Sequence, residues 1–372
     1  MDFSFSDDQD ALRHGVRTVL DTECDVDSLR TFELADEDAR ADLSANRWTI
    51  LAELGAPALV VPATSNGLSL TDVDLVGVLE EAGYACLPEP LLETAALAAP
   101  TLAALLPEPA AAVSLRALVE DDAMFAVGGI DVTPQGVTSP SEVSADGMLR
   151  TPRVVGARDA ALLLLACRDD ESGWQLHAVP AASCTAEPTP ALSATRDVST
   201  VHWPLASDTL LAYGVAAETA VTLLADRAAA ATAAQLVGLA DRMLSMAAAY
   251  AKERHQFGKP IGSFQAVKHH LADARVALEF ARPAAYRAAW SLATAQPSLS
   301  HDASMAKAMA SDAADLAARV ALQVHGAIGY TWECDLHFFM KRTWALSRAW
   351  GDAATHRRLV LSHTLATPRA AG

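Results

Sequence analysis

The C-terminal part of this 372-residue chain is dominated by alanine- and leucine-rich runs in which apolar residues recur every three or four positions. The longest of these runs lie at 217–252, 264–295 and 302–325. Such periodicity is typical of amphipathic α-helices, and alanine is the strongest intrinsic helix former. Small side chains also allow helices to approach closely, as in a four-helix bundle or a seam between subunits, so we expect residues 209–372 to form a helical domain of this kind.

The region before this bundle changes in texture. Residues 7 to about 118 are again helical in pattern and are interrupted by prolines, whereas 119–208 holds short apolar runs bounded by Gly, Pro, Ser and Asp. Runs of that length between turn residues predict β-strands. The expected fold is α+β and mainly α, with an N-terminal helical domain at 1–118 and a small β-barrel or β-sandwich domain before the bundle. The expected strands lie at 124–127, 149–155, 161–167, 174–179 and 198–203.

Charge and cysteine usage exclude several classes of partner. The formal net charge is −18, from 46 acidic and 28 basic residues. Nucleic acid and anionic membranes need a basic face, so neither is expected. The five cysteines are scattered without C-x-x-C spacing, which favours buried thiols in a reducing compartment over disulfides or a metal site. No secretory signal or run of the roughly 20 apolar residues that span a bilayer is visible, and we expect a cytoplasmic protein.

One segment between two helical runs combines residue types that suit a nucleotide. Residues 254–265 read Arg-His-Gln-Phe-Gly-Lys-Pro-Ile-Gly-Ser-Phe-Gln. The guanidinium of Arg254 presents a planar fork of donors that matches phosphate oxygens. Phe257 offers a ring face, and Gly258 lets the backbone come close to a ligand or take a positive φ. The alternative is a helix-ending turn with a solvated arginine.

A second segment, at 323–333, reads Gln-Val-His-Gly-Ala-Ile-Gly-Tyr-Thr-Trp-Glu. We expect the preceding helix to end at Gly326 in the left-handed conformation. Thr331 is expected to cap the next helix, with Glu333 in its first turn. A glycine turn between helices leaves backbone N–H groups free for a phosphate or a flavin edge. The same pattern also fits a capped helix–turn–helix without a ligand.

Together the two segments resemble the flavin-contacting motifs of the acyl-CoA dehydrogenase family. The first matches Arg-x-x-Phe-Gly and continues through Phe264-Gln265, and the second resembles Gln-x-x-Gly-Gly-x-Gly with Ala327 in place of the second glycine. The helix–β–helix order of the chain is also that of the family. The resemblance implies FAD as cofactor and an acyl-CoA thioester as substrate. The implied cofactor-binding residues are Arg254, Phe257, Gly258, Gln265, Gln323 and Gly326.

The catalyst that the resemblance implies is missing. The family removes the α-proton of the thioester with a carboxylate base while the flavin accepts the β-hydride. In most members that base is a glutamate just before Gly-Thr, and the corresponding turn here places Trp350 at the glutamate position, followed by Gly351. Some members carry the base earlier in the chain, at a position that falls here near Ala228. The catalytic residue is therefore unknown: Asp352 is the nearest carboxylate, and its place after Gly351 favours a helix N-cap.

The middle domain also lacks the motifs with which the family grips its own flavin, because residues 125–136 and 153–159 match neither of them. In the family, the retained motifs reach across an interface to a neighbour's flavin. The chain therefore resembles the short, base-lacking subunits of heteromeric actinobacterial acyl-CoA dehydrogenases. This implies a heterotetramer with a homologous, base-bearing subunit in fatty acid or steroid metabolism, with an electron-transfer flavoprotein as electron acceptor.

Two alternatives stay open at this point. The chain could form a homotetrameric dehydrogenase that uses a displaced base such as Asp352. It could also be a flavin-free interaction or scaffold protein that has kept the fold.

Overall fold

The computed structural model describes residues 5–106, 109–143, 147–169 and 173–366. These residues belong to two compact units, and neither unit is one continuous stretch of chain. The domain limits at residues 118 and 208 stay a prediction. Unit 1 takes its residues from Met1–Arg30, Val76–Leu87 and Ala229–Gly372, and unit 2 from Thr31–Leu75 and Pro88–Ala228.

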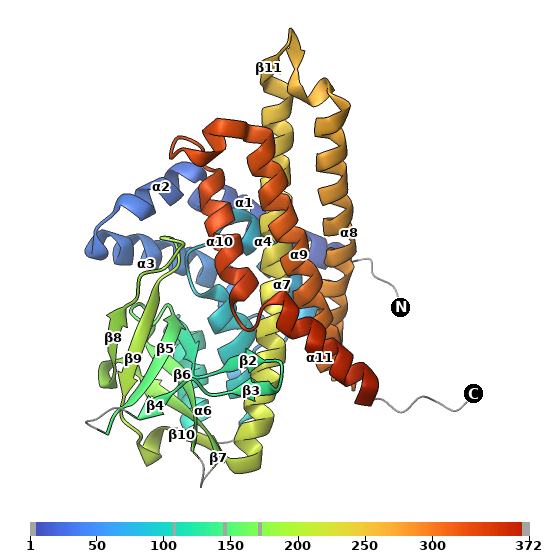
Figure 1. The fold of residues 1–372 in the computed structure, drawn as a ribbon. Helices are drawn as coiled ribbons and strands as arrows, with labels where there is room; N and C mark the ends of the chain where they lie inside the picture. Colours follow the sequence, from blue (N-terminus) through green and yellow to red (C-terminus); the bar gives the residue numbers. More distant parts are fainter. Residues whose placement is uncertain (1–4, 107–108, 144–146, 170–172, 367–372) are drawn as a thin grey trace. The chain divides into compact units, whose positions relative to one another are not determined.

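Unit 1 is a bundle of helices (Figure 1). The runs expected at 264–295 and 302–325 form the helices α8 and α9, and their shared core is rich in alanine. The helical-bundle prediction for the C-terminal part is therefore confirmed. The helices of the unit are α1 (Asp7–Glu23), α8 (Gln265–Ala293), α9 (Leu299–His325), α10 (Leu336–Arg348), α11 (Ala353–Ala366) and parts of α2 (Val26–Leu34), α4 (Asp72–Ala85) and α7 (Gly214–Glu253).

Small residues set how closely the helices of unit 1 approach. A Cβ built on Gly238 of α7 would lie 1.9 Å from the carbonyl oxygen of Glu80 on α4, and one built on Gly83 would lie 2.1 Å from that of Gln235. The two helices therefore cross with their backbones in contact, which no larger residue permits at these positions.

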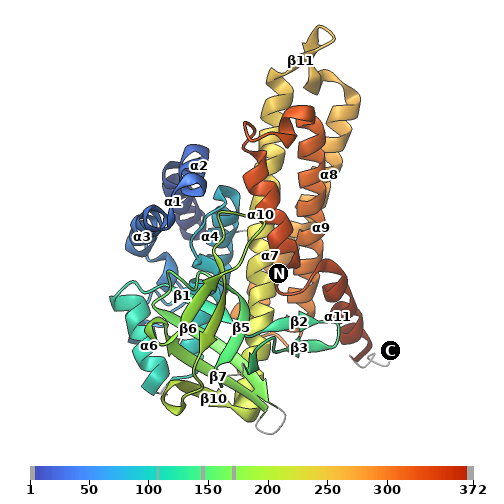
Figure 2. The same ribbon diagram turned by 60° about the vertical axis from the view of Figure 1, so that its left-hand side comes forward.

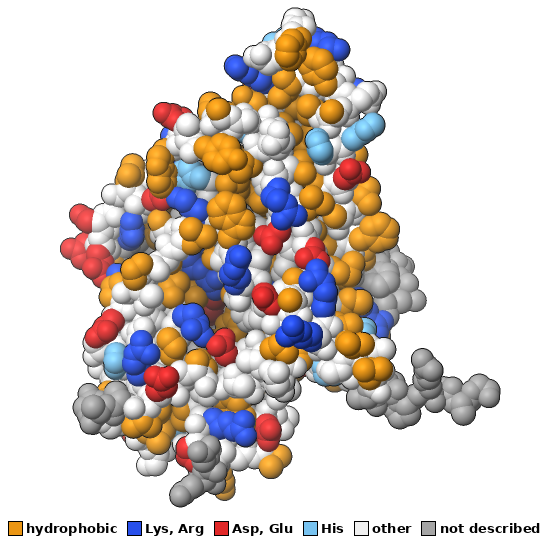
Figure 3. Space-filling model, in the orientation of Figure 1, with side chains coloured by type: hydrophobic (Ala, Val, Ile, Leu, Met, Phe, Trp, Pro, Cys, Tyr) orange, Lys and Arg blue, Asp and Glu red, His pale blue; other side chains and the backbone are white. Residues whose placement is uncertain are grey.

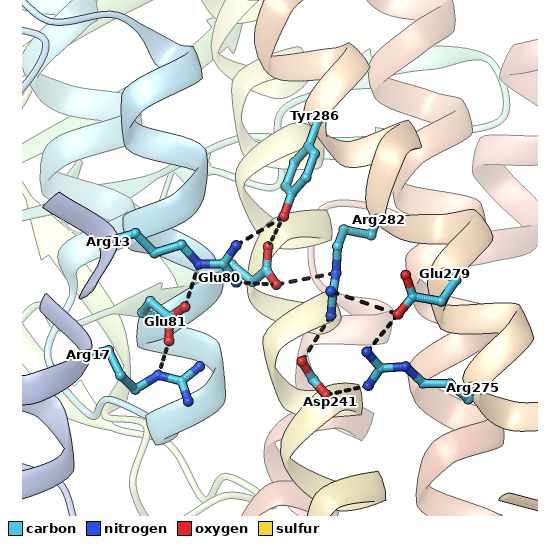
Figure 4. A network of polar contacts seen from close by, with 9 residues as sticks. All are labelled: Arg13, Arg17, Glu80, Glu81, Asp241, Arg275, Glu279, Arg282 and Tyr286. Atoms are coloured by element: carbon cyan, nitrogen blue, oxygen red, sulfur yellow. Dashed lines mark hydrogen bonds and ion pairs between the residues drawn. The ribbon is translucent and has the colours of Figure 1, made fainter. Parts of the chain in front are cut away.

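A network of charged side chains joins α1, α4, α7 and α8 within unit 1 (Figure 4). Arg13 donates to Glu81 at 2.5 Å and to Glu80 at 2.7 Å. The hydroxyl of Tyr286 donates to the other oxygen of Glu80 at 2.6 Å. Burial alone would lower the pKa of Arg13, but the two carboxylates beside it raise that pKa overall. The N-terminal helix is thus tied to the bundle by paired charges, with the carboxylates of Glu80 and Glu81 buried.

Unit 2 contains two four-stranded sheets (Figure 2). In the first, with strand order β1-β6-β7-β10, β1 and β6 are parallel and the other pairs are antiparallel. The second, with order β4-β5-β9-β8, is antiparallel throughout. The strands of the sheets are β1 (Phe125–Gly128), β4 (Glu142–Val143), β5 (Leu149–Val155), β6 (Leu162–Asp169), β7 (Gly173–Pro180), β8 (Thr185–Pro188), β9 (Val198–Trp203) and β10 (Leu210–Tyr213), and a separate hairpin is formed by β2 (Asp131–Thr133) and β3 (Gly136–Thr138).

All five strands expected from the sequence are present, two of them with the expected bounds, and the mainly helical α+β fold is confirmed. The core of the β region includes Trp203, which is fully buried and donates its indole N–H to the hydroxyl of Thr151 at 2.9 Å. Within the helical region expected at 7–118, Leu92–Ala98 forms a π-helix before the α-helix α5 (Ala99–Ala104). Unit 2 also holds α3 (Glu37–Glu53) and α6 (Pro109–Glu120).

Candidate functional site

Residues 255–260 form a two-stranded hairpin at the junction of α7 and α8 (Figure 1). β11 (His255–Gln256) pairs with β12 (Lys259–Pro260), so the loop consists of Phe257 and Gly258 alone. Both loop residues have positive φ, 53° and 79°, as in a type I′ turn. Below the strands, the N–H of Ile261 donates to the carbonyl oxygen of Arg254 at 2.7 Å and closes the hairpin.

The aromatic ring at the tip of the hairpin is open to solvent. Phe257 is 91% exposed, and its ring meets Phe264 only edge-on, at 6.1 Å between centroids. The ammonium of Lys259 lies 4.3 Å from the centroid of Phe264. A Cβ built on Gly258 would meet no atom within 4 Å. The hairpin thus presents a ring face beside open space, which is the arrangement that stacking on a planar ligand requires.

The hairpin and its surroundings are rich in basic side chains, although the chain as a whole is acidic. Arg254 is exposed and lies in a short stretch with many other exposed basic side chains, against an overall net charge of −18. Hydrophobic and basic side chains are seen together over the hairpin at the top of the space-filling view (Figure 3). Such a surface attracts an anion such as a diphosphate. The exposed basic residues of the stretch are Lys252, Arg254, His255, Lys259, Lys268, His269 and His270.

A stacked ring pair links the two segments singled out from the sequence. Tyr250 of α7 stacks on His325 at the end of α9, with 4.6 Å between ring centroids. The carbonyl oxygen of Tyr250 accepts from the N–H of Arg254, and Gly326 follows His325 directly. The Tyr250–His325 stack therefore adjoins both segments: Tyr250 is hydrogen-bonded to Arg254, and His325 precedes Gly326. The two glutamines of the prediction are exposed, Gln265 as the first residue of α8 and Gln323 on the last turn of α9.

Two details of the second segment differ from the prediction. Gly326 has a positive φ of 65°, but its ψ of −140° lies outside the left-handed helical region and is open to few residues other than glycine. Thr331 does not cap the next helix, because a 3₁₀ turn (Gly326–Tyr330) comes first and α10 begins only at Leu336. The N-cap position belongs to Asp335, whose carboxylate accepts from Arg30 at 2.6 Å. Thr331 instead closes the 3₁₀ turn, with its hydroxyl donating to the carbonyl oxygen of Ile328 at 2.8 Å.

The turn that carries Trp350 lies between α10 and α11 and is held from several sides. Trp350 and Gly351 have φ of 58° and 89°. Asp352 accepts a hydrogen bond from the backbone N–H of Thr355 at 2.8 Å, so its predicted N-cap role is confirmed. The hydrogen bonds from Thr355 also lower the pKa of Asp352. A carboxylate with a lowered pKa that is occupied by a cap is poorly suited to take a proton from carbon.

The two segments of unit 2 that match no flavin motif of the family, 125–136 and 153–159, are linked by an ion pair. Arg153 lies at a bulge in β5, with φ of 59°, and donates to Asp131 of β2 at 2.6 Å. Ala228, near the alternative base position, is fully buried.

The sequence reading missed the basic surroundings of the hairpin and the Tyr250–His325 stack. The excess of Lys and His between 252 and 270 is visible in the sequence and could have been found as a local charge reversal. The stack joins residues that are far apart along the chain, and nothing in the local sequence marks it. Among the described residues, no group of three or more His, Cys, Asp or Glu side chains is placed to hold a metal ion. The described helices include none long and apolar enough to cross a membrane.

Comparison with known proteins places the chain in a family. The model of the acyl-CoA dehydrogenase C-terminal domain matches residues 218–365. The acyl-CoA dehydrogenase IpdE2 of Mycolicibacterium smegmatis is 33% identical over 343 residues, which cover 91% of this chain and 92% of that protein. FadE34 of Mycobacterium tuberculosis is 31% identical over 98% of this chain, which spans 49% of the length of FadE34. The chain belongs to the acyl-CoA dehydrogenase family.

Solved structures show the same fold. A chain of the ChsE4–ChsE5 complex from Mycobacterium tuberculosis superposes with a TM-score of 0.85 at 22% identity, covering 99% of this chain and 100% of that one. Butyryl-CoA dehydrogenase from Megasphaera elsdenii gives 0.85 at 20% identity, covering 98% and 100%.

Membership of the family points to FAD as the cofactor. The residues near the hairpin fit its diphosphate and adenine, since Arg254 offers an exposed guanidinium and Phe257 an exposed ring. At the turn that carries Trp350, the carboxylate of Asp352 is occupied as a helix cap.

Proposed function

We propose that this chain is the non-catalytic subunit of a heteromeric, FAD-dependent acyl-CoA dehydrogenase that acts on an acyl-CoA thioester. In this proposal the hairpin and the Gly326 turn contact a flavin seated in a homologous, base-bearing partner, in an α2β2 assembly. The observation that carries it is the contrast between the hairpin and the 347–352 turn. The ring of Phe257 is 91% exposed, whereas the carboxylate nearest the base position is used as a helix cap.

In this proposal, the residues of the hairpin and of the Gly326 turn each have a separate role in holding the cofactor. Arg254 would pair with the diphosphate, for which a guanidinium supplies two parallel donors. Phe257 would stack on the adenine, and the backbone at Gly258 and Gly326 would allow close approach. Gln265 and Gln323 would supply amide donors and acceptors at the rim. When bound, FAD supplies the hydride acceptor of the reaction.

The chain's own proton-transfer chemistry is limited. On the resemblance, the turn at Trp350 corresponds to the position from which a subunit performs its own proton transfer, and an indole has no group that accepts a proton at neutral pH. Loss of a positioned general base costs on the order of 10² to 10⁴ in rate. Abstraction of the α-proton is therefore assigned to the partner, and an electron-transfer flavoprotein is the proposed acceptor of the electrons.

The test is co-expression of the full chain with a homologous dehydrogenase chain that carries the glutamate, followed by measurement of bound FAD and acyl-CoA oxidation. Arg254→Ala should weaken FAD binding by the complex about tenfold to a hundredfold, the usual loss for a charge-assisted contact. Arg357→Ala is the control, because it removes an exposed guanidinium of α11, outside the hairpin. The control should leave FAD binding unchanged.

Other outcomes would decide for other functions. Stoichiometric FAD and turnover from this chain alone would refute the non-catalytic role, and loss of that turnover in Asp352→Asn would establish a displaced base. An assembled complex without FAD, unaffected by Arg254→Ala, would instead identify a scaffold protein.

A further inference from the structure

A cavity of about 720 Å³ lies wholly within unit 2. Its walls come from the corner between α2 and α3 at 32–41, from the turn at 158–159 after β5, and from residues 188–198, which run from the end of β8 to the start of β9 (Figure 1). Ligand pockets in proteins have volumes of roughly 300 to 1,000 Å³. The cavity is therefore large enough for a small metabolite, and the proposed function makes no use of it.

Most charged side chains on the cavity wall are already compensated by the protein. Arg158 donates to Glu37 at 2.6 Å and to Asp197 at 2.8 Å. Arg196 pairs, at 3.4 Å, with a carboxylate of the π-helix. Asp38 lies in the first turn of α3, where the helix N-terminus favours a negative charge. These groups have partners or a favourable field without any ligand.

Arg40 is the exception among the cations of the wall. Its Nε and Nη2 donate to the backbone carbonyl oxygens of Phe32 at 2.9 Å and Glu33 at 2.6 Å, at the end of α2. Within the part of the chain that the structure describes, it pairs with no carboxylate. A guanidinium carries five N–H donors, so Arg40 keeps both its charge and several donors for an anion in the cavity.

Asp159 is the exception among the carboxylates. It is half-buried on the cavity wall, and among the described residues no group donates a hydrogen bond to it. Burial raises the pKa of Asp159, and the nearby carboxylate of Asp197 raises it further, while the guanidinium of Arg158 offsets this only in part. A half-buried carboxylate without a hydrogen-bond partner is costly, and a cation in the cavity would remove that cost.

The uncharged part of the wall is mainly apolar. Apart from Thr189 and Ser193, the uncharged residues that line the cavity are all apolar, and they include Phe32, Pro190 and Val198. Apolar walls with a few placed polar groups are typical of sites for small molecules. The cavity thus offers one cation, one carboxylate and an apolar surface between elements of the same unit.

We propose that this cavity binds a small zwitterion with an apolar body, that is, a hydrophobic amino acid. Arg40 would pair with the carboxylate of the ligand and Asp159 with its ammonium group. The apolar body would lie against the wall that includes Phe32 and Pro190. A ligand with only one of the two charges leaves the other protein group unpaired and therefore binds more weakly.

The test is titration calorimetry of the full chain with two amino acids, leucine and phenylalanine, and two analogues of leucine. Leucinamide keeps the ammonium group but has no carboxylate, and isocaproate keeps the carboxylate but has no ammonium group. The better-bound amino acid should bind about tenfold or more tightly than either analogue, because each charge-assisted contact contributes about 1.5 to 3 kcal/mol.

Two substitutions assign the two ends of the ligand. Asp159→Asn should weaken binding of the amino acid about tenfold and leave binding of isocaproate unchanged. Arg40→Gln should weaken binding of both. Asp42→Asn is the matched control, because it neutralises an exposed carboxylate of α3 that does not line the cavity, and it should change neither affinity.

Arg40 also holds the end of α2, so Arg40→Gln can lower stability. Asp159→Asn keeps the shape of the side chain and removes a half-buried charge, and its unfolding midpoint should stay the same or rise. This variant therefore tests the site without disturbing the fold.

Three results would overturn the inference: no binding of either amino acid at millimolar concentration, equal affinity for the amino acid and its single-charge analogues, or an amino-acid affinity that Asp159→Asn leaves unchanged. None of them bears on the proposed function, which is tested by the response of FAD binding to Arg254→Ala.

Discussion

The hairpin at 255–260 and the turn at 347–352 each contain an aromatic residue followed by a glycine, but the two segments are supported in different ways. Each places an aromatic residue and a glycine in consecutive positive-φ conformations, Phe257-Gly258 in one and Trp350-Gly351 in the other. The hairpin is held by two short strands, and its ring is 91% exposed. The turn is held by Lys307 of α9, which is fully buried and donates to the carbonyl oxygens of Ser347 at 3.1 Å and Gly351 at 3.0 Å. The buried His356 of α11 also donates, from Nε2, to the carbonyl oxygen of Trp350 at 2.8 Å. The same pair of backbone conformations thus occurs in both turns, and the surroundings decide whether the turn is exposed or fixed in place.

The largest difference between the two regions should appear on removal of their supports. Lys307→Met leaves two buried carbonyl groups without a donor, and each such group costs about 1 to 3 kcal/mol, so we expect a loss of about 4 kcal/mol in unfolding free energy. Phe257→Ala at the exposed tip should change it by less than about 0.5 kcal/mol. Chemical denaturation of both variants measures this contrast. A loss below about 1 kcal/mol for Lys307→Met would show that the turn is not held by this lysine.

The turn should also be sensitive to acid. The pKa of His356 is about 4 in the folded chain and the ordinary value is 6.5, so between these pH values the unfolded chain binds a proton that the folded chain does not. Unfolding free energy should therefore fall as pH decreases from 6.5 to about 4, by about 3 kcal/mol for this group.

The measurement is the pH dependence of unfolding for the native chain and His356→Gln, which keeps a donor for the carbonyl of Trp350. Burial also lowers the pKa of His177 in unit 2 to about 4. His177→Gln is therefore a control in which a second buried histidine is removed away from the turn, and it too should reduce the pH dependence of unfolding. Equal pH dependence in the native chain and His356→Gln would contradict the assignment.

Asp352 provides a smaller test on the same turn. Asp352→Ala removes the N-cap of α11 and should cost about 1 kcal/mol, whereas Asp352→Asn keeps an equivalent cap and should be nearly neutral. Dehydrogenation by the complex should be the same in Asp352→Asn as in the native protein, because the carboxylate is occupied by Thr355. A large loss of activity with normal stability would make Asp352 a base after all.

The sequence predicted those parts of the fold that local patterns control. The strands Leu149–Val155 and Val198–Trp203 have the expected bounds, because alternating and apolar runs bounded by turn residues mark strands. The N-cap at Asp352 was also predictable from a local pattern, an aspartate placed after Gly351 and before a helical run. The expected cap at Thr331 was wrong because Thr331 closes a 3₁₀ turn, with its hydroxyl bonded to Ile328, and the next helix begins only at Leu336. The π-helix Leu92–Ala98 also has no local signal in its composition.

The cofactor-binding residues stay a prediction, and their structural setting did not follow from the sequence. The motifs at 254–265 and 323–333 carry the family's residue types, so their chemistry could be inferred from the sequence alone. The stack of Tyr250 on His325, which joins them, depends on the packing of α7 against α9. The support of Trp350 by Lys307 likewise joins residues 40 or more positions apart. Long-range contacts of this kind follow from the tertiary fold, and no local period or spacing encodes them.

The smallest expected effect, at the tip of the hairpin, tests whether strain there serves function. Asparagine followed by glycine is the preferred pair in a type I′ turn, whereas phenylalanine at φ of 53° is strained. Phe257→Asn should therefore raise the unfolding free energy by up to about 1 kcal/mol, since it relieves that strain. The same variant should weaken FAD binding by the complex about tenfold, because the stacking ring is lost. Thermal unfolding of the chain and FAD titration of the complex measure the two effects. A variant that is more stable and still binds FAD normally would show that Phe257 has no part in holding the cofactor.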